Sequence, residues 1–87
     1  MAASPRDQAA VTNRLRRALL AFKSAQLLVL THQRQKQAVS QADLDAVKDS
    51  AMEAAEAFYV FAAAGLVAGA DDQRLLGQIE KYLADSA

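Results

Sequence analysis

Three arginines near the N-terminus, Arg14, Arg16 and Arg17, form the densest basic cluster of the chain. Guanidinium groups hold phosphate oxygens through paired hydrogen bonds, so this cluster is a candidate contact for RNA or DNA. The aromatic side chains on which single-stranded bases stack are missing from its neighbourhood. We therefore favour a second interpretation, in which the arginines lie on a solvated face or pair with acids of the same chain.

Glu53, Glu56 and His32 are the other residues whose types suit catalysis or metal binding. Two carboxylates three residues apart share a helix face and suit acid–base or metal chemistry, and a histidine titrates near neutral pH or binds metals. The sequence has no second histidine, no cysteine, no glycine-rich phosphate loop and no nucleophile motif. We therefore predict that the chain is not an enzyme, that it binds no metal or cofactor, and that these three side chains have structural roles.

The length and composition indicate one helical domain over residues 1–87. Hydrophobic residues make up 53% of the chain and charged residues 23%, which is typical of a globular protein. One proline and three glycines leave few helix breakers. The longest apolar run, 58–70, is too short to span a bilayer, which needs roughly 20 residues. The absence of cysteine is compatible with a reducing compartment, so we predict a cytoplasmic protein without a membrane span.

The charge is divided unevenly although the formal net charge is zero. Residues 1–39 contain seven Lys and Arg residues and one acid, whereas residues 40–87 contain three basic residues and nine acids. Such an asymmetry indicates either a nucleic-acid partner or two halves that neutralise each other.

The first half of the chain predicts one long helix, over about 5–37. Ser4 followed by Pro5 is a helix start signal, with serine as the N-cap and proline in the first helical position. Apolar and small residues recur in steps of four and three, which describes one face of a helix. This face comprises Val11, Leu15, Ala18, Phe22, Ala25 and Val29.

A second helix is predicted over about 41–68, after a tight turn with Ser40 as its N-cap. The same spacing recurs along Leu44, Val47, Ala51, Ala54, Phe58, Phe61, Gly65 and Ala68. Because the turn is short, the two helices should lie antiparallel. Folding the two faces together places Phe22 opposite Phe58, and brings Lys23 near Glu56 and Arg34 near Asp45. We expect these charged pairs to form within the chain.

Gly69 should end the second helix, and a third helix is predicted over about 72–84. The predicted fold class is therefore all-α, a long antiparallel hairpin plus a short third helix. This three-helix bundle can become a larger bundle by dimerising. The two long helices carry more apolar residues than one seam uses, and the third helix is too short to cover the remainder. From this surplus we predict the following contact residues: Leu20, Leu27, Leu30, Met52, Tyr59 and Leu66.

These features favour a non-enzymatic protein–protein interaction module that binds a protein partner or, as a homodimer, a second copy. Size and predicted hairpin shape are similar to those of the small helical co-chaperones of bacterial type III secretion. That resemblance implies an adaptor or chaperone-like protein that holds an amphipathic helix. The alternative is a nucleic-acid-binding helical dimer that uses Arg14, Arg16 and Arg17.

Overall fold

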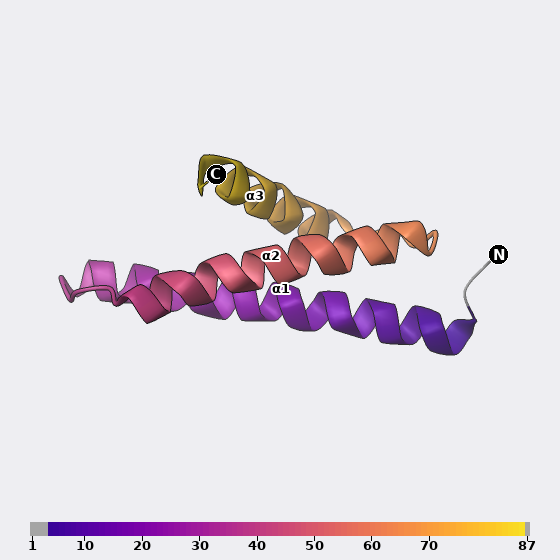
Figure 1. Cartoon of the computed structure of the whole chain (residues 1–87), viewed down its shortest axis with the longest axis horizontal. Helices are drawn as coiled ribbons and strands as arrows, with labels where there is room; N and C mark the ends of the chain where they lie inside the picture. The colour runs from indigo at the N-terminus through magenta and orange to yellow at the C-terminus, as the bar shows by residue number, and fades with distance from the viewer. Residues whose placement is uncertain (1–3, 87) are drawn as a thin grey trace.

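The computed structural model describes residues 4–86, and these form three α-helices in the order that the sequence predicts. Helix α1 spans Pro5–Arg34, α2 spans Gln41–Ala63 and α3 spans Ala70–Ser86. Figure 1 shows α1 and α2 side by side and antiparallel along the long axis of the molecule, with α3 on one side of them. The all-helical fold with its close α1–α2 pair is confirmed.

Both long helices begin at the serines that the sequence marks. The hydroxyl of Ser4 accepts a hydrogen bond from the backbone N–H of Asp7 at 3.2 Å, and Pro5 follows it as the first helical residue. The hydroxyl of Ser40 accepts one from the backbone N–H of Asp43 at 3.1 Å. Each bond satisfies an amide that has no partner within its helix.

The predicted helix ends need correction. Helix α1 stops at Arg34 and not at about 37, because Lys36 adopts a left-handed conformation with φ of 57°. Helix α2 stops at Ala63 and not at about 68, because Gly65, with φ of 79°, already reverses the chain and Gly69 does not act as the stop. Helix α3 begins at Ala70 and continues to Ser86, so Asp71 and Asp72 lie in its first turn, where acids favour the helix dipole.

The core is a seam of large side chains from α1 against alanines from α2. Phe22 is almost completely buried, and Ala51, Ala54 and Ala57 are fully buried. Small residues on one helix allow the backbone of the other to approach closely. Helix α3 adds a third apolar layer. It consists of Leu75, Leu76 and Ile79.

The register of the hairpin differs from the predicted one by about one helical turn. His32 lies 3.4 Å from Asp43, which is about one turn earlier in α2 than the predicted pairing of Phe22 with Phe58 requires. The rings of Phe22 and of Tyr82 in α3 pack edge to face, with their centroids 6.1 Å apart. The ring of Phe58 packs against that of Phe61. The connection between Arg34 and Gln41 is longer than the predicted tight turn, so each residue of α1 lies opposite an earlier residue of α2.

The predicted intrachain ion pairs are also absent. Between residues 4 and 86, neither Lys23 with Glu56 nor Arg34 with Asp45 forms an ion pair. The register shift does not explain this by itself, because all four side chains are exposed.

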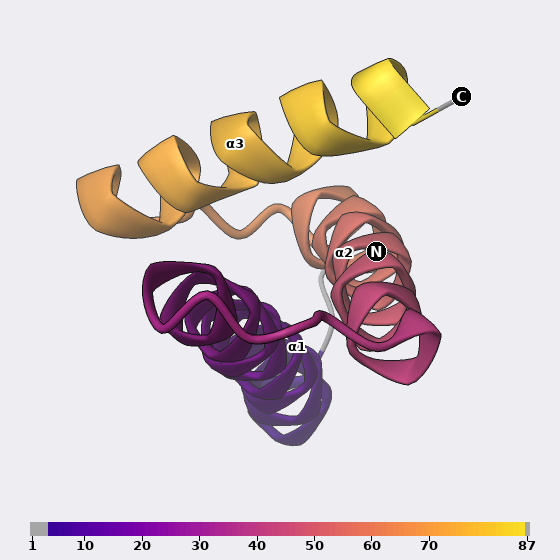
Figure 2. The ribbon, with the colours of Figure 1, turned by 90° about the vertical axis from the view of Figure 1, so that its left-hand side faces the viewer.

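Helix α3 crosses one face of the hairpin obliquely. Figure 2, along the hairpin axis, shows α3 lying over both α1 and α2. With 17 residues against 30 in α1 and 23 in α2, it is too short to cover that face completely. No helix within residues 4–86 is long and apolar enough to cross a membrane.

The alanine seam predicts a difference between two leucine substitutions in α2. Ala54→Leu inserts three carbons where α1 packs directly, so we expect it to destabilise the fold by about 1–3 kcal/mol. Ala46→Leu, at an exposed site of the same helix, should change the free energy of unfolding by less than about 0.5 kcal/mol. Urea unfolding at a fixed protein concentration measures both, and equal losses would contradict this packing.

Candidate functional site

The outer edge of α1 carries exposed leucines. Leu20 is 64% exposed and Leu27 is 62% exposed. They lie two residues before and five residues after Phe22, which is buried in the seam. At about 100° per residue, both positions are on the opposite side of the helix from Phe22. The two leucines therefore point away from α2.

The outer edge of α2 repeats this arrangement. Met52 is 52% exposed and Tyr59 is 77% exposed. They lie two residues before and five residues after the buried Ala54, so they face away from α1. The leucine pair and the Met–Tyr pair thus occupy opposite edges of the hairpin. They do not make one patch.

The other two predicted contact residues lie elsewhere. Leu30 is 44% exposed and faces the side on which α3 packs, beyond the end of that helix. Leu66 is a correction to the predicted surface. Because α2 ends at Ala63, Leu66 lies in the connection to α3, where it is half-buried and packs against the core.

A small apolar groove opens where α3 leaves the hairpin uncovered. It has a volume of about 200 Å³ and lies near the α1–α2 turn. Leu30 and Leu44 form its exposed rim, and Val29 and Val47 lie deeper. Tyr82 of α3 closes one side and Gln26 supplies its polar group. The groove suits one or two apolar side chains of a partner.

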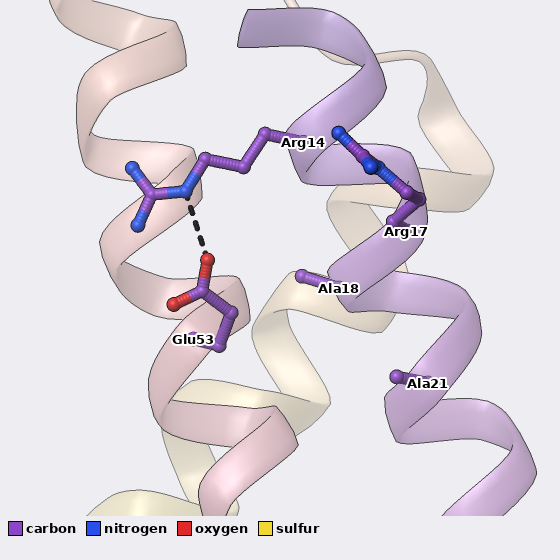
Figure 3. A pocket seen from close by; sticks show the side chains of 5 residues that line it. All are labelled: Arg14, Arg17, Ala18, Ala21 and Glu53. Atoms are coloured by element: carbon purple, nitrogen blue, oxygen red, sulfur yellow. Dashed lines mark hydrogen bonds and ion pairs between the residues drawn. The ribbon is translucent and has the colours of Figure 1, made fainter.

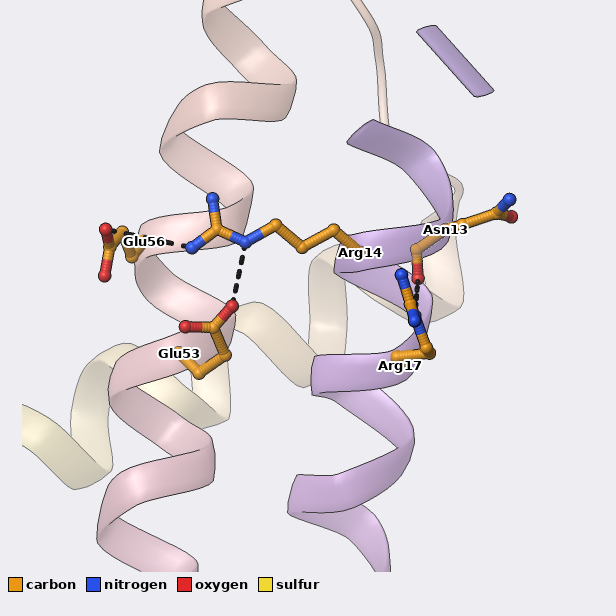
Figure 4. A network of polar contacts seen from close by, with 5 residues as sticks. All are labelled: Asn13, Arg14, Arg17, Glu53 and Glu56. Atoms are coloured by element: carbon orange, nitrogen blue, oxygen red, sulfur yellow. Dashed lines mark hydrogen bonds and ion pairs between the residues drawn. The ribbon is translucent and has the colours of Figure 1, made fainter. Parts of the chain in front are cut away.

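Arg14 forms the main polar link between the two long helices. Its Nε donates a hydrogen bond to Oε1 of Glu53 at 2.8 Å, and its Nη2 lies 3.7 Å from Oε1 of Glu56 (Figure 4). The hydrogen bond to Glu53 raises the pKa of Arg14, and the same bond lowers the pKa of the Glu53 carboxyl. The guanidinium thus already has carboxylate partners within the chain.

An open hollow of about 370 Å³ lies beside this link. Figure 3 shows Arg14 reaching across to Glu53 on one side of it, with the short side chains of Ala18 and Ala21 below. Arg17 also lines the hollow, and its Nε donates a hydrogen bond to the backbone oxygen of Asn13 at 3.4 Å. The hollow has one carboxylate and two guanidinium groups, and alanines form its wall.

The three arginines singled out by the sequence do not converge. Arg14 and Arg17 are three residues apart and share one side of α1. Arg16 is two residues from Arg14, so it projects from the other side of the helix, next to Leu20 and Lys23. A phosphate group held by Arg14 and Arg17 would therefore not reach Arg16.

His32 lies beside one acid, Asp43, and apart from Glu53 and Glu56. Its Nδ1 lies 3.4 Å from Oδ2 of Asp43, without the geometry of a hydrogen bond, and Nδ1 is buried with no hydrogen-bond partner. Glu53 and Glu56 lie in the middle of the hairpin, and the long side chain of Arg14 reaches both of them. Within the described residues no three His, Cys, Asp or Glu side chains gather where they could hold a metal ion.

Some exposed apolar residues were not among the predicted contacts. Val67 and Leu44 are exposed because α2 ends early and α3 is short. The sequence did contain a signal for the edge positions, since Leu20, Leu27, Met52 and Tyr59 all lie two residues before or five after a core position. The Arg14–Glu53 bond depends on the register, which the sequence alone did not fix.

The Arg14–Glu53 bond predicts how stability depends on pH. A carboxyl whose pKa is lowered by folding stabilises the fold above its usual pKa of about 4.3, and that contribution is lost as the pH falls through the lowered value. We therefore expect Glu53→Gln to lower Tm slightly at pH 7, with a difference that shrinks toward zero in acid. Glu80→Gln, at an exposed site of α3, is the control. A Glu53→Gln difference that is independent of pH would contradict this assignment.

A scan against protein-family models and searches of curated proteins and of solved structures found no match to this chain.

Proposed function

We propose that this protein is a non-enzymatic interaction module, adaptor-like or co-chaperone-like, that binds protein through the apolar outer edges of its hairpin. The observation that carries the proposal is the exposure of large apolar side chains on the backs of both long helices. These side chains are Leu20 and Leu27 on α1 and Met52 and Tyr59 on α2. Single exposed apolar residues are common on protein surfaces and need no explanation. Here they form a pair seven residues apart on each edge, which is the spacing of helix–helix contacts.

Each edge has the form of a helix-binding surface. Leu20 and Leu27 are seven residues apart, and so are Met52 and Tyr59, so each pair lies along one line parallel to its helix. A partner helix laid on such a line can cover both side chains at once. Burying one large apolar side chain contributes about 1.5–3 kcal/mol, so a pair on each edge supports a moderate affinity.

The polar groups support binding rather than catalysis. Glu53 and Glu56 are next to Arg14, His32 is next to Asp43, and these two sets lie at different positions along the hairpin. Acid–base catalysis needs such groups to converge on one substrate with a nucleophile or a stabiliser of developing charge. The proposal therefore assigns them to positioning the two helices.

A photo-reactive benzophenone amino acid at Tyr59 or at Leu27 tests the proposal in cells of the native host. Both sites are exposed, so the substitution should not disturb the fold. We expect covalent adducts of defined mass from both positions after irradiation, whether the captured protein is a second copy or another chain. Gln78, exposed on α3, provides the matched control. Adducts no stronger than those from Gln78 would exclude both edges as protein-binding surfaces.

A nucleic-acid-binding helical dimer is the second candidate function, and one observation favours it. Helix α1 carries six basic residues and one acid, and Arg16, Arg17 and Lys23 form no ion pair between residues 4 and 86. These side chains are available to phosphates, whereas the guanidinium of Arg14 already contacts two carboxylates. A dimer would present two such cationic edges.

This second candidate predicts that the arginines contribute unequally. We expect Arg16→Ala and Arg17→Ala each to weaken RNA or DNA binding at low salt and to reduce the slope of log K against log salt by about one. Arg14→Ala should have a smaller effect because its guanidinium is paired with Glu53. Fluorescence anisotropy with labelled oligonucleotides measures this, and no binding at low salt would remove the candidate.

A further inference from the structure

The outer edges of α1 and α2 carry matching series of exposed residues with opposite charge. On α1 the series advances in steps of four and three residues, and we name it the basic stripe. It consists of Arg16, Leu20, Lys23, Leu27, Leu30 and Arg34. On α2 a series with the same steps is named the acidic stripe. It consists of Asp45, Asp49, Met52, Glu56, Tyr59 and Ala63. All twelve residues are exposed.

Aligned antiparallel, the two stripes form six layers, each with one residue from either stripe, and four of these layers are complementary. Lys23 meets Glu56 and Arg34 meets Asp45, so two layers pair opposite charges. Leu20 meets Tyr59 and Leu27 meets Met52, so two further layers pair apolar side chains. The remaining layers place Arg16 at Ala63 and Leu30 at Asp49. A parallel alignment of the same stripes would put Leu20 against Asp49 and Leu27 against Glu56.

Within one chain the stripes cannot meet. Apart from Leu30, which lines the groove near the turn together with Leu44 and Val47, the basic stripe lies on the side of α1 away from α2. The acidic stripe lies on the side of α2 away from α1, and of its residues Glu56 is reached by Arg14. Figure 4 shows Glu56 on the side of α2 that is remote from α1, where its nearest cation is Arg14 at 3.7 Å. Lys23, Arg34 and Asp45 form no ion pair in the described part of the chain. The charged pairs that the sequence predicts are thus left unformed by the fold.

We propose that the occupant of each stripe is a second copy of this chain, with α1 of one copy lying antiparallel on α2 of the next. The inference rests on the proposed function and identifies its partner. Because the stripes lie on opposite edges, the contact joins two different surfaces, and repetition gives a ring or an open row of hairpins. The paired stripes run for about 27 Å, the rise of a helix over residues 16–34.

Charge favours this contact over a two-fold dimer through either edge. Two α1 edges would bring Arg16, Lys23 and Arg34 of both copies together, and two α2 edges would do the same for the acids. Like charges across an interface oppose association, whereas complementary charges set partner choice and register. The apolar layers supply the attraction, and the charged layers select the antiparallel partner.

A charge-swap experiment between copies tests the proposal. In the layer that pairs Lys23 with Glu56, Lys23→Glu places an acid on both stripes. In the same layer Glu56→Lys places a base on both stripes. Sedimentation velocity up to millimolar concentration should show self-association of the unchanged chain, weakened about tenfold in each variant alone. An equimolar mixture of the two variants should restore it, because each contact then pairs opposite charges. Lys81→Glu, at an exposed site of α3, should leave it unchanged.

The outcomes separate this inference from the proposed function. Restoration in the mixture supports a contact between copies, whereas restoration only in the double variant of one chain would overturn it. An unchanged chain that stays monomeric, or whose mass saturates at two copies, also overturns it. If adducts from Tyr59 and Leu27 then contain another protein, the interaction module stands with a different partner. If there are no adducts, the proposed function fails as well.

Discussion

The close approach of α1 to the alanines of α2 is the constraint on which the rest of the structure depends. Ala51, Ala54 and Ala57 are fully buried, and only residues without a long side chain let Phe22 enter this seam. A seam built this way is narrow, so it buries one side of each helix and leaves the back of each helix uncovered. The third helix widens the core on one face through Leu75, Leu76 and Ile79, but it cannot reach both edges. The exposed apolar pairs on the edges follow directly from this geometry.

The turn between the long helices decides which polar groups meet. With the connection extending from Arg34 to Gln41, His32 comes to Asp43 and the Arg14 side chain spans to Glu53. A connection that shifted α2 by one helical turn along α1 would give His32 and Arg14 different partners. The same residues of α1 would still be buried. Register and burial are thus set by different parts of the chain. Burial depends on the spacing of apolar residues, and register depends on the conformation of a few residues near Lys36.

This separation explains how much the sequence could predict. Helix order, both serine caps and the α1 core positions Leu15, Ala18 and Phe22 follow from local signals and spacing, and the structure contains them. Helix ends were missed because Lys36 and Gly65 take left-handed conformations that other glycines and lysines of the chain do not adopt. The exposed edges could be predicted as surplus apolar surface. Their division between opposite sides of the hairpin was not recognised, because it requires placing each residue around its helix axis.

The positions of the charged residues around the helix axes bear on why basic residues gather on α1 and acids on α2. Helix α1 carries six basic residues and one acid, and α2 carries five acids and one lysine, so mutual attraction between the two helices is the simplest explanation of the pattern. Yet exposed charges on opposite edges are separated by both helices, and salt screens interactions beyond roughly 8–10 Å. Among the Lys and Arg residues of α1, which lies wholly within the described residues, Arg14 alone forms ion pairs with carboxylates of α2. Lys23 and Arg34 are too far from the acids of their own α2 for an ion pair. They can pair closely with an acidic helix only if that helix belongs to another molecule. In the proposed contact between copies, the edges of the hairpin therefore supply the selectivity between molecules.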